Sequence, residues 1–282
     1  MEDFLVDMLN SISDGVDQSV VDKLLQTPAQ YSQPLYDIAV AVADTAVRPI
    51  AAIVLAIVFT LELARASVKA DGDRELGVRM IGLLMLKMVL VLIAAQNADL
   101  FLKAIDQIGD AVMGGITSVA PSTGGTGSSG LGDQMKDAIE DTGWTGKIAA
   151  MILLVLPFLA SKLAAITCTI VIMLRFVQIY MLTAFNPLPI AFLACDETRQ
   201  MGVGYLKAYA AAIFQCATLW LGIVMYRAMA ADSVKVDEWH DGDSLSGWIV
   251  GQFGNLLLAS VLLIGVVVIS TSVAKKWLGS EA

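Results

Sequence analysis

Four ionisable side chains lie inside stretches of sequence that are otherwise apolar: Glu62, Lys87, Lys162 and Arg175. A charge at the centre of a membrane helix costs about 2.5–3.5 kcal/mol to insert, so such a residue normally faces protein or water and has a partner. The chemistry that these residue types offer is ion pairing and the lining of a polar surface within an apolar environment.

Glu62 and Lys87 are candidates for one such ion pair. Only a short polar segment, RASVKADGDRELGVR, separates the apolar stretches that carry them, so the two stretches form a hairpin with both residues toward the same end. The long side chain of Lys87 can extend toward Glu62. Two interpretations stay open: the pair fastens the two helices together, or the two residues line a polar path or a seam between subunits.

A second polar group occurs in the segment RFVQIYMLTAFNPLPIAF, which begins at Arg175. Arg175 and Gln178 are three residues apart and share one face of a helix. Asn186 precedes Pro187, which disfavours the helical conformation at Asn186, and Pro189 adds a second interruption. We expect the helix to end or break here, with the freed carbonyl groups met by protein or water. The alternative is a plain helix end at the cytoplasmic surface.

Motifs for catalysis, nucleotide binding or metal binding are not found in the sequence. The segment GWTGKIA lacks the first glycine of a phosphate-binding loop and has Ile148 where Ser or Thr belongs. HExxH and GxSxG patterns are absent, the three cysteines are not closely spaced, and the single histidine, His240, lies in a polar loop. We therefore expect a protein that is not an enzyme and that holds no cofactor or metal.

Membrane-spanning helices are the elements that must position these groups. Of the 282 residues, 57% are hydrophobic and only 16% are charged, whereas a soluble domain carries about 25% charged residues. The apolar residues gather into runs long enough to cross a bilayer. These runs cover approximately residues 47–63, 80–95, 148–195, 205–230 and 248–273. The expected fold class is all-α, a multi-pass transmembrane helical bundle.

The distribution of charge predicts five crossings, with the N-terminus outside the cell and the C-terminus inside. Loops rich in Lys and Arg stay in the cytoplasm, and such residues gather in the loop 64–79, the turn 196–207 and the C-terminal end. Acidic residues instead dominate 1–46, 97–147 and 231–247. This pattern requires residues 148–195 to cross an odd number of times.

Residues 148–195 would form a straight helix of about 70 Å, more than twice the thickness of the hydrocarbon. Two spans, one long projecting helix, or a span with a re-entrant piece would each accommodate this length. The charge pattern favours one net crossing, so we expect a long helix that is kinked near Pro157 or broken before Pro187.

Four regions follow from these assignments. Residues 1–46 are expected to form external amphipathic helices, 47–96 a transmembrane hairpin, 97–147 an external acidic loop with a Gly/Ser-rich, flexible stretch, and 148–282 a transmembrane helical region with a cytoplasmic tail. In the first region, apolar residues between positions 4 and 16 recur at helical spacing. That helix would lie either on a membrane or partner surface or on the protein's own domain.

Three segments of the chain resemble a known family of membrane proteins. They are QTPAQYSQPLYDIAVAVADTAVRPIAAIVLAIVFTLELARA from Gln26, LKMVLVLIAAQNADLFLKAID from Leu86 and LRFVQIYMLTAFNPLPIAFLACDETRQMGVGYLKAYAAAIFQ from Leu174. The order of features resembles the TrbL-type polytopic inner-membrane subunit of type IV secretion and conjugation systems, in the version carried by conjugative elements of Gram-positive bacteria. The positions that match the pattern are Glu62, Lys87, Arg175, Pro187, Pro189 and Lys207.

The resemblance implies a multi-pass subunit of the bacterial cell membrane that forms or scaffolds the channel for DNA or protein transfer. Its implied partners are the lipid bilayer, the ATPases and other subunits of the secretion system, further copies of itself, and transiently the single-stranded DNA or protein in transit. The candidate channel or interface residues are Glu62, Lys87, Arg175, Gln178, Asn186, Pro187 and Pro189. The alternative function is a stand-alone transporter or channel for small solutes or ions, which would predict an internal inverted repeat. The sequence shows no such repeat.

Overall fold

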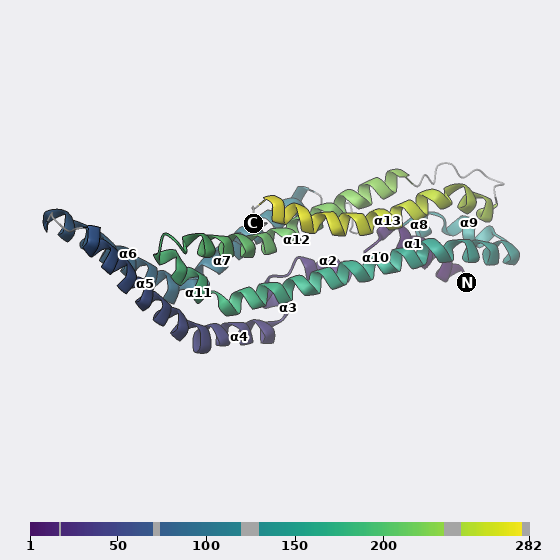
Figure 1. The fold of residues 1–282 in the computed structure, drawn as a ribbon. Helices are drawn as coiled ribbons and strands as arrows, with labels where there is room; N and C mark the ends of the chain where they lie inside the picture. The colour runs from purple at the N-terminus through teal and green to yellow at the C-terminus, as the bar shows by residue number, and fades with distance from the viewer. Residues whose placement is uncertain (17, 70–73, 120–129, 234–243, 278–282) are drawn as a thin grey trace. The chain divides into compact units, whose positions relative to one another are not determined.

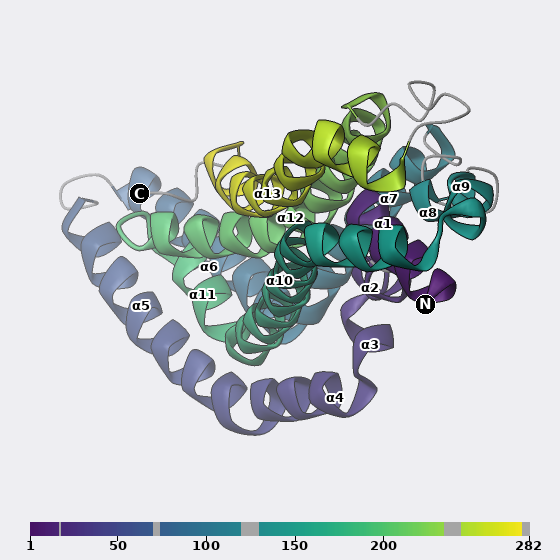
Figure 2. The same cartoon turned by 90° about the vertical axis from the view of Figure 1, so that its right-hand side faces the viewer.

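The computed structural model describes residues 1–16, 18–69, 74–119, 130–233 and 244–277, and every regular element among them is helical (Figure 1 and Figure 2). Five segments are long and apolar enough to cross a membrane: Gln33–Val68, Gly77–Gln96, Trp144–Phe185, Arg199–Met229 and Leu245–Ala274. The prediction of an all-α, multi-pass helical protein is therefore confirmed. The side of the membrane on which each end lies stays a prediction.

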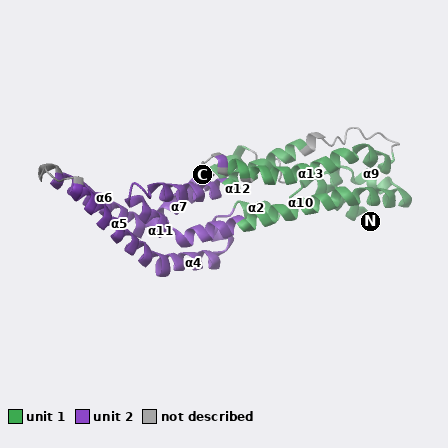
Figure 3. Cartoon of the chain, viewed as in Figure 1, with its two compact units in different colours: residues 1–25, 111–174, 215–274 green, residues 26–110, 175–214, 275–282 purple. Residues whose placement is uncertain are grey.

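The chain forms two compact units, which we describe separately (Figure 3). Unit 1 comprises residues 1–25, 111–174 and 215–274, and unit 2 comprises residues 26–110, 175–214 and 275–282. Two long helices, α10 (Trp144–Phe185) and α12 (Arg199–Ser233), contribute residues to both units.

Unit 1 has the amphipathic helix α1 (Glu2–Asp14) in its core. The apolar side chains of α1 recur three or four residues apart, which places them on one helix face. Leu5, Met8, Leu9 and Ile12 are each at most 1% exposed. They pack with residues of α8 (Leu131–Gln134), α9 (Lys136–Asp141), α10 and α13 (Leu245–Trp277). The sequence left open whether this helix lies on a membrane or partner surface or on the protein's own domain. The structure shows it packed on the protein's own domain.

The C-terminal end of α1 is fastened by side chains of α12. Gly15 follows the helix with a φ of 66°, a left-handed conformation that glycine adopts without strain. The Tyr226 hydroxyl donates to the carbonyl oxygen of Ile12 at 3.1 Å, and Arg227 donates to the carbonyl oxygen of Val16 at 2.9 Å. The last carbonyl groups of a helix lack partners within it, so the Tyr226 hydroxyl supplies a partner to one of them, and Arg227 holds the chain just beyond the helix.

Unit 2 contains the transmembrane hairpin. Helix α4 (Gln33–Val42) passes through a π-helical stretch, Ala43–Val47, into α5 (Arg48–Lys69), so the helical backbone that carries the first span begins at Gln33. Helix α6 (Arg74–Gln96) then returns beside α5. Apolar residues of both helices pack on the short helix α11 (Pro187–Ala191) and on the 3-10 turn Phe192–Ala194 that follows it.

Most of the long apolar stretch 148–195 lies in one helix, as expected, while the number of times it crosses the membrane stays a prediction. Helix α10 has 42 residues, about 63 Å at 1.5 Å per residue. It continues past Pro157 and ends at Phe185, and α11 begins two residues later at Pro187. The break predicted before Pro187 is therefore confirmed.

The region 97–147 contains more regular structure than an acidic loop. Most of its described residues lie in α7 (Ala98–Val119), α8 and α9. Its apolar residues recur at helical spacing, and Leu102 of α7 is 3% exposed, so burial of one face drives helix formation despite the acidic composition. The stretch expected to be flexible, GGITSVAPSTGGTGSSGLGD, covers residues 114–133: residues 114–119 instead belong to α7 and residues 131–133 to α8, while residues 120–129 lie outside the described residues.

Candidate functional site

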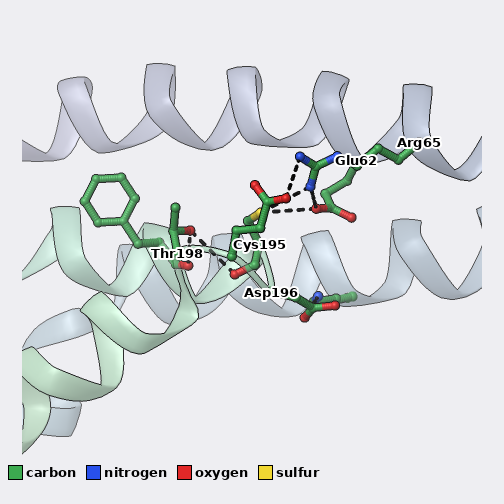
Figure 4. Close-up of polar contacts among 8 residues, drawn as sticks. Glu62, Arg65, Cys195, Asp196 and Thr198 are labelled. Atoms are coloured by element: carbon green, nitrogen blue, oxygen red, sulfur yellow. Dashed lines mark hydrogen bonds and ion pairs between the residues drawn. The ribbon is translucent and has the colours of Figure 1, made fainter.

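The candidate site is a polar junction in unit 2, where the turn Cys195–Thr198 meets the hairpin of α5 and α6 (Figure 4). The turn follows the 3-10 segment Phe192–Ala194, and Cys195 has an extended backbone with φ −104° and ψ 137°. The Thr198 hydroxyl donates to the carbonyl oxygen of Phe192 at 2.8 Å. This bond closes the turn just before α12 begins at Arg199.

Two ion pairs connect the turn to the hairpin. Lys87 Nζ of α6 lies 3.0 Å from Asp196 Oδ1, and Arg65 Nη2 of α5 lies 2.9 Å from Glu197 Oε1. The side chains of Asp196 and Glu197 are 81% and 70% exposed. In water, exposed pairs of this kind contribute little stability, so the environment around them decides their importance.

Glu62 occupies the more enclosed part of the junction, with its side chain 16% exposed. Its Oε1 lies 3.2 Å from Arg65 Nη1 and accepts a hydrogen bond of 3.2 Å from the Cys195 thiol. The carboxylate of Glu62 thus contacts the Arg65 cation on its own helix, α5, and joins α5 to the turn through the Cys195 thiol. Cys195 is buried and takes part in this polar contact.

The predicted ion pair between Glu62 and Lys87 is not the pair that forms. Lys87 contacts Asp196, and Glu62 contacts Arg65 and Cys195. The prediction treated the hairpin as isolated, whereas the turn after α11 brings acidic groups against it. The sequence contained a usable signal, since DET directly follows an apolar run, but nothing in it specified which cation each acid would meet.

The Asn-Pro-x-Pro element directs the chain into this turn. Asn186 is 3% exposed and keeps a helical backbone, with φ −56° and ψ −35°. The expectation that Pro187 would move Asn186 out of the helical region is therefore wrong. Pro187 occupies the first turn of α11, where its missing N–H costs nothing, so α10 and α11 are separated by a single residue. Pro189 lies within α11, and its carbonyl oxygen faces Gly202.

Arg175 and Gln178 lie in a different environment from the exposed junction. Arg175 is 3% exposed and Gln178 is half-buried, both on the last part of α10. The neighbouring Phe176 stacks on Tyr31 with ring centroids 3.9 Å apart, and the Tyr180 hydroxyl donates to the carbonyl oxygen of Pro28 at 2.8 Å. The burial of Arg175 and Gln178 fits the expectation that they share a protected helix face. The aromatic contacts beside them were not predicted.

A further polar contact joins α7 to α12 within unit 2. The Tyr209 hydroxyl, in a side chain 1% exposed, donates to Asp106 Oδ1 at 2.9 Å. Burial raises the pKa of Asp106 from 3.8 to about 6; the Tyr209 hydrogen bond opposes this rise and the nearby charge of Asp110 adds to it. Tyr36 of α4 is a further titratable group near Asp106, and it also lies near Lys103, Asp99 and Asp37. The partly buried carboxyl of Asp106 therefore keeps its proton to a higher pH than a solvated aspartic acid does.

Docking of α7 on α12 is expected to weaken as pH rises through about 6. Asp106 has a higher pKa in the docked state than in a solvated chain, so its contribution is fully present below about pH 4 and is lost through pH 6. A shift of about two units corresponds to at most about 3 kcal/mol. Amide exchange of residues 98–110, corrected for intrinsic rates, measures this. Asp106→Asn should remove the pH dependence and Asp99→Asn should retain it; equal dependence in all three proteins would contradict the assignment.

These features define a multi-pass helical membrane protein in which two ion pairs join a transmembrane hairpin to a turn. The model of the family described as TrbL/VirB6 plasmid conjugal transfer like protein matches residues 13–187, more than half of the chain. The chain belongs to this family, which confirms the resemblance and identifies a membrane subunit of conjugative type IV secretion. Neither the curated proteins nor the solved structures gave a match.

Proposed function

We propose that this chain forms or scaffolds the channel through which a conjugative type IV secretion system moves DNA or protein across the bacterial cell membrane. The family gives the system to which the subunit belongs. The position of one ion pair supports a role at the passage or at a seam between subunits.

The pair formed by Lys87 and Asp196 carries the proposal. Lys87 lies close to the middle of the 20-residue candidate span Gly77–Gln96, and its side chain is 38% exposed while that of Asp196 is 81% exposed. Leu86 and Leu90, which flank Lys87, are each 59% exposed. An ion pair left open at that depth would be costly against hydrocarbon. Water in a passage, or a neighbouring subunit, must therefore cover it.

The remaining assignments follow from this role. We infer that the chain is not an enzyme and that a partner ATPase of the secretion system supplies the energy. The exposed apolar helices would contact lipid, other secretion subunits and further copies of the chain, and DNA or protein in transit would touch the junction transiently. We also propose the orientation from the charge pattern, with residues 1–46 and 97–147 outside and the C-terminus in the cytoplasm.

Deletion of the gene from its conjugative element tests the proposed function. DNA transfer to recipient cells should be abolished while growth of the donor is unchanged, and the intact gene supplied in trans should restore transfer. Normal transfer by the deletion strain would refute the proposal. A passage for small solutes could also use an exposed ion pair, and it would instead give altered solute uptake with transfer intact.

Reversing the charge of Lys87 should reduce transfer, and reversing Asp196 together with it should restore part of the activity. Lys87→Glu places two carboxylates together at mid-span, where an uncompensated charge costs about 2.5–3.5 kcal/mol, enough for a loss of about tenfold or more in assembled subunit. The double variant Lys87→Glu/Asp196→Lys recreates an ion pair. Transfer frequency and the amount of membrane-inserted subunit are measured together.

Lys103→Glu provides the control for this experiment. Lys103 forms its ion pair with Asp99, one turn away on the same helix, and its side chain is 54% exposed. Transfer by the Lys103 variant should stay near the wild-type level. If Lys87→Glu behaves like the control, or if the double variant is no better than the single one, the contact between Lys87 and Asp196 does not contribute as proposed.

A further inference from the structure

The first half of α7, residues 98–110, presents three different faces. One face is buried in unit 2, with Ala98 1% and Leu102 3% exposed. A second face is polar and carries the ion pair between Lys103 and Asp99, with Gln107 exposed one turn further on. The third face is apolar and bare. Its residues Leu100, Phe101 and Ile108 are 57%, 45% and 55% exposed.

The chain itself brings this helix to the edge of the membrane. Helix α6 ends its candidate span at Gln96, and α7 begins at Ala98. Asn97, the single residue between them, donates its backbone N–H to Ile93 at 3.1 Å and accepts from the N–H of Leu100 at 3.0 Å. The hydrogen bonding is nearly continuous across the join, so Leu100 lies about one helical turn past the end of a span.

Helix α12 packs against the later residues of α7 and extends beyond them as a candidate membrane span. Asp106 accepts the hydrogen bond from Tyr209 of α12. Gly109 lies so close to Ile213 that a Cβ atom added there would be 2.2 Å from its Cγ2 atom. Tyr209 and Ile213 both belong to the candidate span Arg199–Met229, which at 31 residues is longer than a crossing of about 20 residues needs. The bare apolar face of α7 therefore continues beside the first half of a helix that is a candidate to cross the bilayer.

We propose that residues 98–110 form a membrane-boundary helix, with Leu100, Phe101 and Ile108 in contact with lipid chains and with Lys103 and Gln107 toward water. Helix α7 is not among the segments apolar enough to span the membrane, and a helix with one apolar and one polar face typically lies at the boundary. Its charged residues Asp99, Lys103, Asp106 and Asp110 give a net negative charge. Apolar contact with the acyl chains, not attraction to anionic headgroups, would hold it there.

Adjacent positions on α7 provide a matched pair for the test. Ile108→Cys and Gln107→Cys are each prepared in the full chain, labelled with bimane and reconstituted into phosphatidylcholine nanodiscs. The native cysteines, Cys168, Cys195 and Cys216, are buried, so labelled wild-type protein serves as the blank. Brominated phosphatidylcholine quenches labels in contact with acyl chains, and iodide quenches labels in contact with water. Helix content by circular dichroism confirms that both variants fold.

The label at position 108 should be quenched by brominated lipid about twofold or more strongly than the label at 107, with the order reversed for iodide. Equal iodide quenching at the two positions would overturn the proposal in favour of a helix whose two exposed faces are both in contact with water. Protection of position 108 from both quenchers would overturn it in favour of a covering protein surface, such as a second copy. Strong lipid quenching at both positions would overturn the proposal that the face of Gln107 lies toward water. The outcome does not depend on the channel role.

Discussion

Gly202→Ala is expected to destabilise unit 2, whereas Gly204→Ala, two residues later on the same helix, should not. A Cβ atom at position 202 would lie 2.5 Å from the carbonyl oxygen of Pro189, a backbone atom that cannot rotate away, and 2.6 Å from Leu193 Cδ2. Overpacking of this kind costs about 1–3 kcal/mol. At Gly204 nothing lies within 4 Å of the added atom, so the higher helix propensity of alanine should give a gain of up to about 1 kcal/mol.

The contrast between these two variants tests how α12 packs on α11. The contact sets the start of α12 directly after the turn that carries Asp196 and Glu197. Thermal unfolding of the purified protein, followed by amide exchange of residues 199–210, should show a loss for Gly202→Ala only. DNA transfer should fall in the same variant. If both variants unfold alike, α11 and α12 do not approach each other as closely as the structure shows.

The spans and the helix break could be predicted from the sequence because each depends on local properties. Run length and hydropathy identify a transmembrane helix whatever it contacts. Two prolines close together, Pro187 and Pro189, favour a helix interruption, and α10 ends at Phe185 before them, although it continues past the isolated Pro157. The prediction failed at Asn186 itself, because its backbone conformation is decided by the tight passage into α11 and not by the dipeptide alone.

The partners in the polar junction could not be predicted because they are remote in sequence. Lys87 and Asp196 are 109 residues apart, and Cys195 and Glu62 are 133 residues apart. A sequence pattern shows that each charge needs a partner, but the register between the turn and the hairpin decides which one it receives. Glu62 and Lys87 were therefore correctly expected in one hairpin and wrongly expected to pair.

The environment of α1 depends on packing in the same way. Its apolar face is clear in the sequence, yet an amphipathic pattern is equally compatible with lipid, a partner or the protein's own core. In unit 1 this face meets α8, α9, α10 and α13, and Ser161 of α10 donates a hydrogen bond to the carbonyl oxygen of Ser11. A substitution on the buried face distinguishes these environments.

Leu9→Ala is expected to destabilise the packing of α1 in unit 1 by about 2–5 kcal/mol, the range for removing a large buried side chain from a well-packed core. The Leu9 side chain is 0% exposed and belongs to the cluster that includes Met8, Ile12 and Ile249. Amide exchange of residues 2–14 should become faster by about thirtyfold to a few thousandfold, since each 1.4 kcal/mol corresponds to about tenfold.

Leu35→Ala is the matched control, because it makes the same chemical change at a leucine of α4 that is 46% exposed. Its effect on exchange and on thermal unfolding should be small. Repeating the comparison in detergent and in phosphatidylcholine nanodiscs separates the two environments considered for α1. A helix held by the core of unit 1 loses protection in both media, whereas a helix held by the membrane surface would remain protected in nanodiscs, because loss of one leucine removes only part of its lipid contact. Retained protection in nanodiscs would therefore contradict the packing of α1 within unit 1.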